Sequence, residues 1–256
     1  RYWSAHYRGV TFLTENNHDN LFAQPLGKIE KFSFDEAVVD VFPDMIRRSV
    51  PGYETILAHC GELAARYVQA ESTCYDLGCS LGATSLAMRS RINAKNAKIV
   101  SVDNSQAMLS KLSKILESIP SAIQTELVNK DVCECNIDNA SMVVLNFTLQ
   151  FVPKNKRLAL IKKIYNGLNP GGCLVISEKL HFEPESLNLL LSDLHHQFKR
   201  SQGYSDLEIS QKRDSLENVL IPETLDTHIQ RLNSCGFESA SPWFQCFNFC
   251  SLVAIK

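Results

Sequence analysis

The stretch 72–85, STCYDLGCSLGATS, combines a short apolar run with two closely spaced glycines. The run ends at Asp76, and Gly78 and Gly82 follow within six residues. A strand that leads through a glycine turn into a helix lets the backbone approach a bound nucleotide or nucleoside. The spacing is G-x-S-x-G rather than the dinucleotide pattern G-x-G-x-x-G, and no Gly-Lys-Ser/Thr follows as in a phosphate-binding loop. The stretch therefore predicts a turn that holds a nucleoside-like ligand.

Strands and helices alternate around this turn, which predicts an α/β fold with a mostly parallel sheet and helices on both faces. The predicted strands are 73–77, 98–103, 124–128, 141–147 and 172–178. Helical spacing begins at Gly52 and recurs near 82–92, 105–118, 154–167, 184–200 and 205–219. The segment NPGG at 169–172 predicts a turn before the fifth strand. Two β-rich runs at the end of the chain predict an antiparallel hairpin that closes the sheet.

Length and composition predict one large domain with a proper core, since the chain has 256 residues and 45% of them are hydrophobic. Residues 1–18 are expected to be a tail and 19–256 a single domain, with a helical cap at 19–70 and a helical insertion at 181–225. A formal net charge of −2 argues against direct binding of nucleic acid. No run is long and apolar enough to predict a signal peptide or a membrane span.

The nine cysteines are odd in number and irregularly spaced. They form no C-x-x-C pair and no Cys/His set with zinc spacing, so no metal site is expected. Most of them lie in apolar runs, which is typical of buried thiols in a reducing compartment. We therefore expect a cytoplasmic protein.

Three polar residues end successive predicted strands. Asp103 lies 21 residues after Gly82, Asp131 follows the third strand, and Asn146 ends the fourth. Ligands bind at the carboxyl ends of parallel strands, where an acidic residue accepts hydrogen bonds from ribose hydroxyls and a second carboxylate can accept from an exocyclic amine. Other interpretations stay open: a purely structural turn, Asp103 as a helix cap, Asp131 in a surface loop, and an Asn146 that binds backbone groups.

These motifs resemble the class I S-adenosylmethionine-dependent methyltransferases over roughly residues 70–256. The resemblance rests on DLGCSLG, the acidic end of the second strand and GLNPGGCLVISE. It implies a Rossmann-like seven-stranded sheet whose C-terminal hairpin follows a helical insertion. Ser80 departs from the usual glycine and restricts the backbone there.

Longer blocks resemble the carboxy-S-adenosylmethionine synthase family from about Asp19 onward. They are VFPDMIRRSVPGY, YDLGCSLGA, NASMVVLNFTLQF, GYSDLEISQKR and WFQCFNF. The resemblance implies that S-adenosylmethionine and prephenate become carboxy-S-adenosylmethionine and phenylpyruvate. In that family the acidified methyl group loses a proton to the hydroxide that leaves prephenate, and the resulting ylide captures the released carbon dioxide. The product supplies a carboxymethyltransferase that modifies the tRNA wobble uridine, and a homodimer is implied.

The family also implies the site residues. The expected contacts to the S-adenosylmethionine or its product are Tyr53, Gly78, Cys79, Ser80, Asp103, Asn104, Asp131, Val132, Asn146 and Arg213. Arg213 would bind the new carboxylate. Independently, Ser205-x-x-Glu208 predicts a capping box, and Ile209, Leu216 and Leu220 share one face of the following helix with Arg213. A guanidinium buried on an apolar face needs a carboxylate, from a ligand or from the core.

Other candidates have an ordinary structural interpretation as well. Cys79 is expected to pack rather than to act as a nucleophile. His195 and His196 are expected in the core or on the surface, and Glu178 and Lys179 as a surface pair. Lys199 and Arg200 would attract the carboxylates of prephenate or would be solvated. Two further functions remain open, an ordinary methyltransferase acting on a small molecule or tRNA and a non-catalytic S-adenosylmethionine-binding partner of another enzyme.

Overall fold

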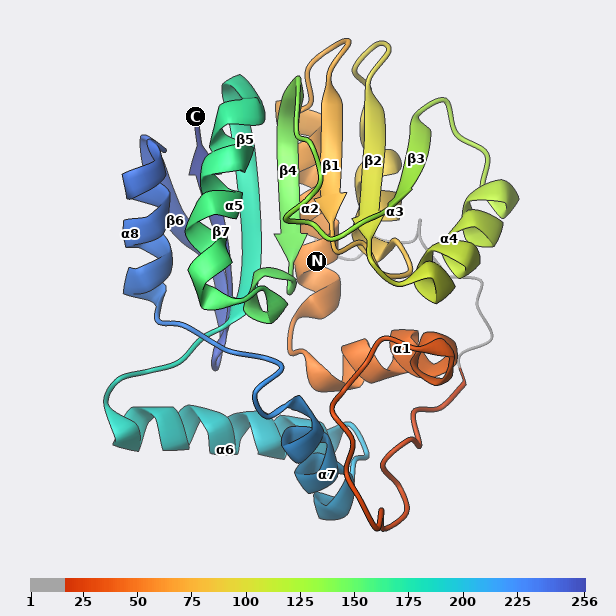
Figure 1. Cartoon of the computed structure of the whole chain (residues 1–256), viewed down its shortest axis with the longest axis vertical. Helices are drawn as coiled ribbons and strands as arrows, with labels where there is room; N and C mark the ends of the chain where they lie inside the picture. The colour runs from red at the N-terminus through yellow and green to blue at the C-terminus, as the bar shows by residue number, and fades with distance from the viewer. Residues whose placement is uncertain (1–16) are drawn as a thin grey trace, which may run out of the picture.

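The computed structural model describes residues 17–256, so nearly all of the predicted tail at 1–18 lies outside the described residues. The chain folds around a seven-stranded sheet in the order β3-β2-β1-β4-β5-β7-β6 (Figure 1). The strands are β1 Thr73–Leu77, β2 Lys98–Asp103, β3 Gln124–Asn129, β4 Ala140–Asn146, β5 Leu168–Lys179, β6 Ser239–Cys246 and β7 Phe249–Ile255. Strands β1 to β5 are parallel and β7 is antiparallel to both of its neighbours, which confirms the predicted α/β fold with its C-terminal hairpin.

The predicted turn at 169–172 is wrong, because β5 begins at Leu168 and contains this segment. Leu168 pairs with Ala140 and Cys173 pairs with Met142, so β5 has more residues than β4 between these two pairs. Gly171 has a φ of +74°. The glycines therefore form an irregularity within a strand, as glycines in strands often do.

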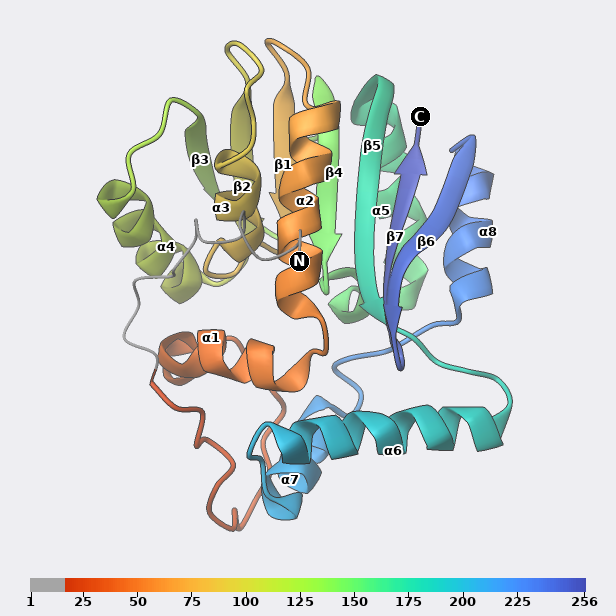
Figure 2. The ribbon, with the colours of Figure 1, turned by 180° about the vertical axis from the view of Figure 1, so that it is seen from behind.

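The helices are α1 Glu36–Ser49, α2 Tyr53–Tyr67, α3 Ala83–Arg89, α4 Gln106–Ser118, α5 Lys154–Gly167, α6 Glu185–Ser201, α7 Asp206–Leu216 and α8 Leu225–Cys235, with a 3₁₀ turn η1 at Leu149–Phe151. Helices α2 and α3 cover one face of the sheet (Figure 2), and α5 and α8 cover the other (Figure 1). Strands β1 and β4 are buried almost throughout between these layers. Continuous apolar strands of this kind are expected in a sheet that is covered on both faces.

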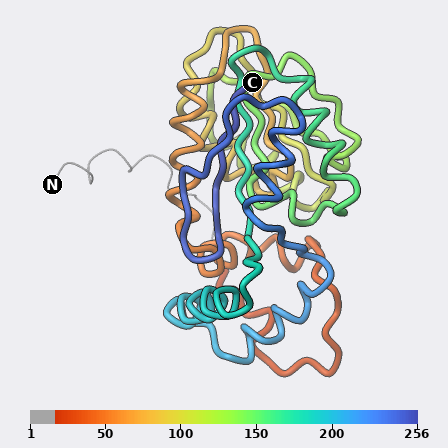
Figure 3. Tube along the Cα trace, turned by 90° about the vertical axis from the view of Figure 1, so that its left-hand side faces the viewer, coloured from red at the N-terminus to blue at the C-terminus, as the bar shows by residue number. Residues whose placement is uncertain are grey.

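A further layer, which we call the helical layer, lies beneath the carboxyl ends of the parallel strands and comprises residues 17–34 with α1, α6 and α7 (Figures 1 and 3). Its parts are far apart in sequence and are joined by buried polar contacts. The Gln211 side chain donates to the carbonyls of Phe22 and Gln24, each at 2.9 Å. Tyr204 donates to the buried carboxylate of Asp19. The layer therefore closes over the edge of the sheet where parallel α/β folds bind ligands.

Three helices differ from the sequence prediction. Helix α7 ends at Leu216, so Leu220 lies beyond it. Helix α1 was predicted only as part of the helical cap at 19–70, and it continues through Pro43. Helix α8 was not predicted, although Thr224 caps its start and Gly236 follows its end. Among residues 17–256 no helix is both long and apolar enough to cross a membrane.

Candidate functional site

The glycine turn after β1 needs its glycines for steric reasons. Gly78 and Gly82 have φ of +79° and +77°, in the region that L side chains rarely adopt. A Cβ at Gly78 would lie 2.3 Å from Oγ1 of Thr148, and one at Gly82 would lie 2.3 Å from Cδ1 of Leu112. The turn therefore lies directly against its neighbours, and its conformation depends on having no side chain at these two positions.

Asp103, at the end of β2, fixes this turn. Its Oδ2 accepts a hydrogen bond from the Ser80 N–H at 2.8 Å, and its Oδ1 accepts from the Ser105 N–H at 2.8 Å. Ser80 has a φ of +50°, so a non-glycine residue is held here in the left-handed region. Burial raises the pKa of the Asp103 carboxyl, while its backbone hydrogen bonds act in the opposite direction. The N-cap of α4 is Ser105, so Asp103 is not the helix cap that the sequence allowed.

All ten residues expected to contact the ligand line one cavity of about 830 Å³. This volume lies within the range of roughly 300–1,000 Å³ that is usual for small-molecule sites. The residues come from α2, from the turn after β1, from the ends of β2 and β4, from the loop after β3, and from α7. Their convergence is a structural fact, whereas their contacts with a ligand stay a prediction.

Polar atoms in the cavity have capacity to bind a ligand. Asn146 donates from Nδ2 to Thr84 Oγ1 at 3.1 Å, and its buried Oδ1 has no hydrogen-bond partner among the described residues. A buried acceptor without a partner is costly, so it marks a place where a ligand donor fits. Asp131 is exposed and accepts from the Cys133 N–H at 2.8 Å, so it belongs both to a surface loop and to the cavity wall.

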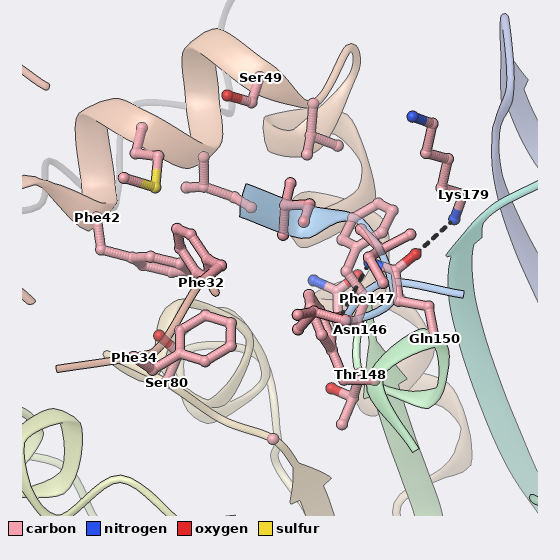
Figure 4. Close-up of a pocket in the computed structure, with 18 of the residues that line it drawn as sticks. Phe32, Phe34, Phe42, Ser49, Ser80, Asn146, Phe147, Thr148, Gln150 and Lys179 are labelled. Atoms are coloured by element: carbon pink, nitrogen blue, oxygen red, sulfur yellow. Dashed lines mark hydrogen bonds between the residues drawn. The ribbon is translucent and has the colours of Figure 1, made fainter. Parts of the chain in front are cut away.

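An aromatic wall that the sequence did not predict lines the side of the cavity near the glycine turn. Phe34 makes edge contacts with Phe32, Phe42 and Phe151, with ring centroids 5.2, 6.0 and 5.5 Å apart. Figure 4 shows the three rings of Phe32, Phe34 and Phe42 close together near Ser80, while Asn146 and Gln150 lie on another side of the cavity. Three of the four phenylalanines belong to the segment before α1 or to α1 itself, so the helical layer supplies most of this wall.

Basic side chains line the part of the cavity near β5. The predicted surface pair at 178–179 is wrong, because Glu178 is buried and its burial raises the pKa of its carboxyl, whereas Lys179 lines the cavity. Lys199 is also buried and lines the cavity, but Arg200 is exposed and pairs with Asp206 at 2.7 Å. The two predicted basic neighbours therefore have different environments.

Both neighbouring histidines line the cavity, and His196 is partly buried. His195 is buried, and its Nε2 lies 2.8 Å from the Ser49 carbonyl. Burial, reinforced by the charge of Lys179, lowers the pKa of His195 to about 3, so the ring is neutral at pH 7. A neutral ring can donate its proton to the Ser49 carbonyl, which makes His195 a structural support of the cavity wall.

Arg213 does not have the buried position that the apolar stripe suggested. Its side chain is 65% exposed and pairs with Asp214 at 3.1 Å. The residues of α7 that are buried include Ile209 and Lys212, while Arg213 lines the cavity at its rim. The predicted apolar stripe is therefore not the buried face of α7, which comprises mainly Glu208, Gln211, Lys212 and Ser215, although Ile209, Arg213 and Leu216 all line the cavity.

Comparisons with known proteins agree with this geometry. A family model described as a methyltransferase domain matches residues 74–172. The carboxy-S-adenosyl-L-methionine synthase of Trichlorobacter lovleyi is 58% identical over 93% of this chain and 98% of its own length. The synthase of the same name from Pasteurella multocida is 51% identical over 93% of this chain and 99% of its own length.

Solved structures share the fold at low sequence identity. An O-methyltransferase family protein from Burkholderia thailandensis has a TM-score of 0.59 and 17% identity over 87% of this chain and 60% of its own. Human N-acetylserotonin methyltransferase has a TM-score of 0.56 and 16% identity, over 94% and 63% of the two chains. These likenesses show the fold, and the identity of 51–58% over nearly the whole length of the curated relatives establishes that the chain belongs to the carboxy-S-adenosyl-L-methionine synthase family.

Proposed function

We propose that this protein converts S-adenosylmethionine and prephenate into carboxy-S-adenosylmethionine and phenylpyruvate. The observation that carries the proposal is the position of Arg213 in the same cavity as the nine other expected ligand contacts. An ordinary methyltransferase has no need of a guanidinium beside the methyl donor. An enzyme that makes a carboxylate there does need one, because the guanidinium fork matches a carboxylate in a bidentate pair.

The proposal includes one orientation of S-adenosylmethionine in the cavity. Asp103 at the end of β2 would accept from the ribose hydroxyls, and Asp131 and Val132 would hold the adenine. The glycine turn would receive the methionine portion, and the unpartnered Oδ1 of Asn146 would accept from one of its donors. The methyl group would then lie towards β4 and β5, in the part of the cavity that is lined by basic side chains.

The chemistry requires that two reactants meet without water. Prephenate loses carbon dioxide and hydroxide as it becomes phenylpyruvate, the hydroxide takes a proton from the methyl group of the sulfonium, and the carbon forms a bond to carbon dioxide. Water is the remaining product, so atoms and charges balance. The chain's own contribution is to hold both reactants close together beneath the helical layer and to exclude solvent.

The test is product formation by Arg213→Ala with prephenate and S-adenosylmethionine. We expect the variant to bind S-adenosylmethionine within about threefold of the original affinity, because Arg213 would contact only the new carboxylate. We expect carboxylated product to fall by at least about tenfold, which corresponds to the loss of about 1.4 kcal/mol or more of charge-assisted hydrogen bonding. Unchanged product formation in the variant would refute the role of Arg213. Transfer of an intact methyl group by the original protein would favour an ordinary methyltransferase.

We further propose that the protein is a cytoplasmic homodimer whose product serves a tRNA wobble-uridine carboxymethyltransferase. Four leucines of α6 and α7 support the dimer, because Leu187, Leu189, Leu190 and Leu207 are exposed. Burying these leucines against a second copy would remove apolar surface from water. Sedimentation at working concentration is the test, and a monomer would contradict the dimer.

A further inference from the structure

Two ammonium groups in the cavity have no ion-pair partner among the described residues. Four cationic side chains line this region: Lys179, Lys199, Lys212 and Arg213. Lys212 lies 3.7 Å from the Asp19 carboxylate, and Arg213 pairs with Asp214. Among residues 17–256, neither Lys179 nor Lys199 has a carboxylate within 4.0 Å of its ammonium group. This part of the free protein therefore has two ammonium groups on the cavity wall that no carboxylate pairs directly, although Asp19 and Glu208 act on Lys199 from a longer distance.

This arrangement is unfavourable in the free protein. Lys199 is only 5% exposed, and its ammonium lies over the ring of Tyr204 at 5.2 Å instead of against an acid. Burial and the nearby charges of Lys212 and Lys179 lower the pKa of Lys199 to about 7. Burial also lowers the pKa of Lys179. Charges buried in this way are normally paired. A bound anion would supply the missing partner and would raise both pKa values.

The two lysines reach the cavity from two layers of the fold, the sheet and the helical layer. Lys179 ends β5, and its backbone N–H donates to Gln150 Oε1 at 2.9 Å, so the base of the side chain is fixed. Figure 4 shows the ammonium group extending away from Gln150. Lys199 comes from α6 in the helical layer. A small molecule held between these two layers could contact both ammonium groups at once.

The topology separates this region from the expected nucleoside site. In the sheet order, β1 and β4 lie between β2, which ends in Asp103, and β5, which ends in Lys179. Three strand spacings correspond to about 14 Å, which leaves room for a nucleoside and a sulfonium to lie between the two ends of the cavity. The region near Lys179 is therefore beyond the expected methyl group rather than at the ribose.

We propose that Lys179 and Lys199 form an anion subsite that binds the two carboxylates of a dicarboxylate second substrate. The proposal deepens the proposed function and rests on it for the choice of prephenate as the probe. Two ammonium groups without an ion-pair partner match the two negative charges of such a substrate. Lys212 acts differently, since it is already paired with Asp19 and donates to Ser49 Oγ at 3.1 Å, so it supports the wall.

One measurement is prephenate binding by calorimetry to the whole chain saturated with S-adenosylhomocysteine, which has no methyl group and cannot react. The other is the Michaelis constant for prephenate in product formation from S-adenosylmethionine. The variants are Lys179→Met and Lys199→Met, which keep most of the side-chain length and remove the charge. The matched control is Arg200→Gln, because Arg200 adjoins Lys199 in sequence but is exposed and paired with Asp206. We expect each lysine variant to bind prephenate at least about tenfold more weakly, as loss of a charge-assisted contact predicts, and the control to be unchanged. Affinity for S-adenosylmethionine should stay within about threefold, which also reports that the variants are folded.

The outcomes separate this proposal from the proposed function. If the lysine variants bind prephenate as tightly as the original protein, or if the original protein does not bind prephenate at all, the subsite is refuted. If prephenate binding depends on both lysines but no carboxylated product forms, the subsite is supported and the proposed reaction is wrong. Lys199→Met should also raise the melting temperature of the ligand-free protein, because it removes a buried unpaired charge. If this variant is more stable and also binds prephenate more weakly, Lys199 contributes to binding and not to stability.

Discussion

Substitution of Gly78 by alanine tests whether the glycine turn needs a residue without a side chain. Two costs are expected, one from the backbone conformation and one from steric contact with Thr148. A non-glycine residue in the left-handed region costs about 1–2 kcal/mol. The added methyl group would lie 2.3 Å from Oγ1 and 2.4 Å from Cγ2 of Thr148, so both branches of that side chain block it. Overpacking of this kind costs a further amount of about 1–3 kcal/mol. We expect Gly78→Ala to lower the free energy of unfolding by about 2–5 kcal/mol.

The chain offers a matched control. Gly171 has a similar φ of +74°, but a Cβ there would meet no atom within 4 Å. Gly171→Ala should therefore cost only the backbone contribution of about 1–2 kcal/mol. Urea unfolding measures both, and calorimetry measures S-adenosylmethionine affinity, which we expect to fall at least tenfold in Gly78→Ala alone. Thr148→Gly in the Gly78→Ala background removes the obstructing atoms and should recover most of the excess destabilisation. Equal destabilisation by Gly78→Ala and Gly171→Ala would refute the steric argument.

Three further predictions concern charged groups. Arg157 is fully buried and donates hydrogen bonds to Glu223 and to the carbonyls of Gln150, Val152 and Ile221. Arg157→Met should therefore lower the free energy of unfolding in urea by about 3–5 kcal/mol. The control Leu158→Ala, at an exposed neighbouring residue, should be nearly neutral. Asp103→Asn should destabilise the turn by about 1–3 kcal/mol and weaken S-adenosylmethionine binding in calorimetry, because the amide cannot accept from both N–H groups through equivalent oxygens. For Lys199, the folded-state pKa of about 7 lies below the unfolded value, so the unfolded chain binds more protons between pH 7 and about 10.4 and the stability of the free protein rises with pH there. Thermal melts near pH 6 should therefore show that Lys199→Met has a free energy of unfolding higher than that of the original protein by on the order of 1–4 kcal/mol. This difference should shrink as the pH rises. A difference that stays constant between about pH 6 and 10 would contradict a buried charge at Lys199.

The fold was predictable because its signals are local. Alternating strand and helix patterns, a glycine turn after β1 and a capping box at Ser205 each act within a few residues. Parallel strands bring their carboxyl ends to one edge, so the sequence alone predicted that Asp103, Asp131 and Asn146 would converge. Helix α8 has local signals of the same kind, since Thr224 caps its start and Gly236 follows its end. This helix could therefore also have been predicted from the sequence.

The rest of the site depends on contacts between distant segments, which periodicity does not contain. Lys179 and Glu178 are adjacent in sequence, yet one faces the cavity and the other is buried beneath it, because side chains alternate across a strand. The aromatic wall joins residues before α1 to Phe151. The periodicity of α7 indicated which face Arg213 shares with Ile209, but it could not indicate that no described part of this chain covers Arg213.

The most direct test of the central claim is mass spectrometry of the small molecule released from purified, acid-quenched protein after incubation with S-adenosylmethionine and prephenate. We predict a species whose mass equals that of S-adenosylmethionine plus carbon dioxide, and we predict that it forms only when prephenate is present. Recovery of S-adenosylmethionine alone, or of its demethylated product, would contradict the proposed function.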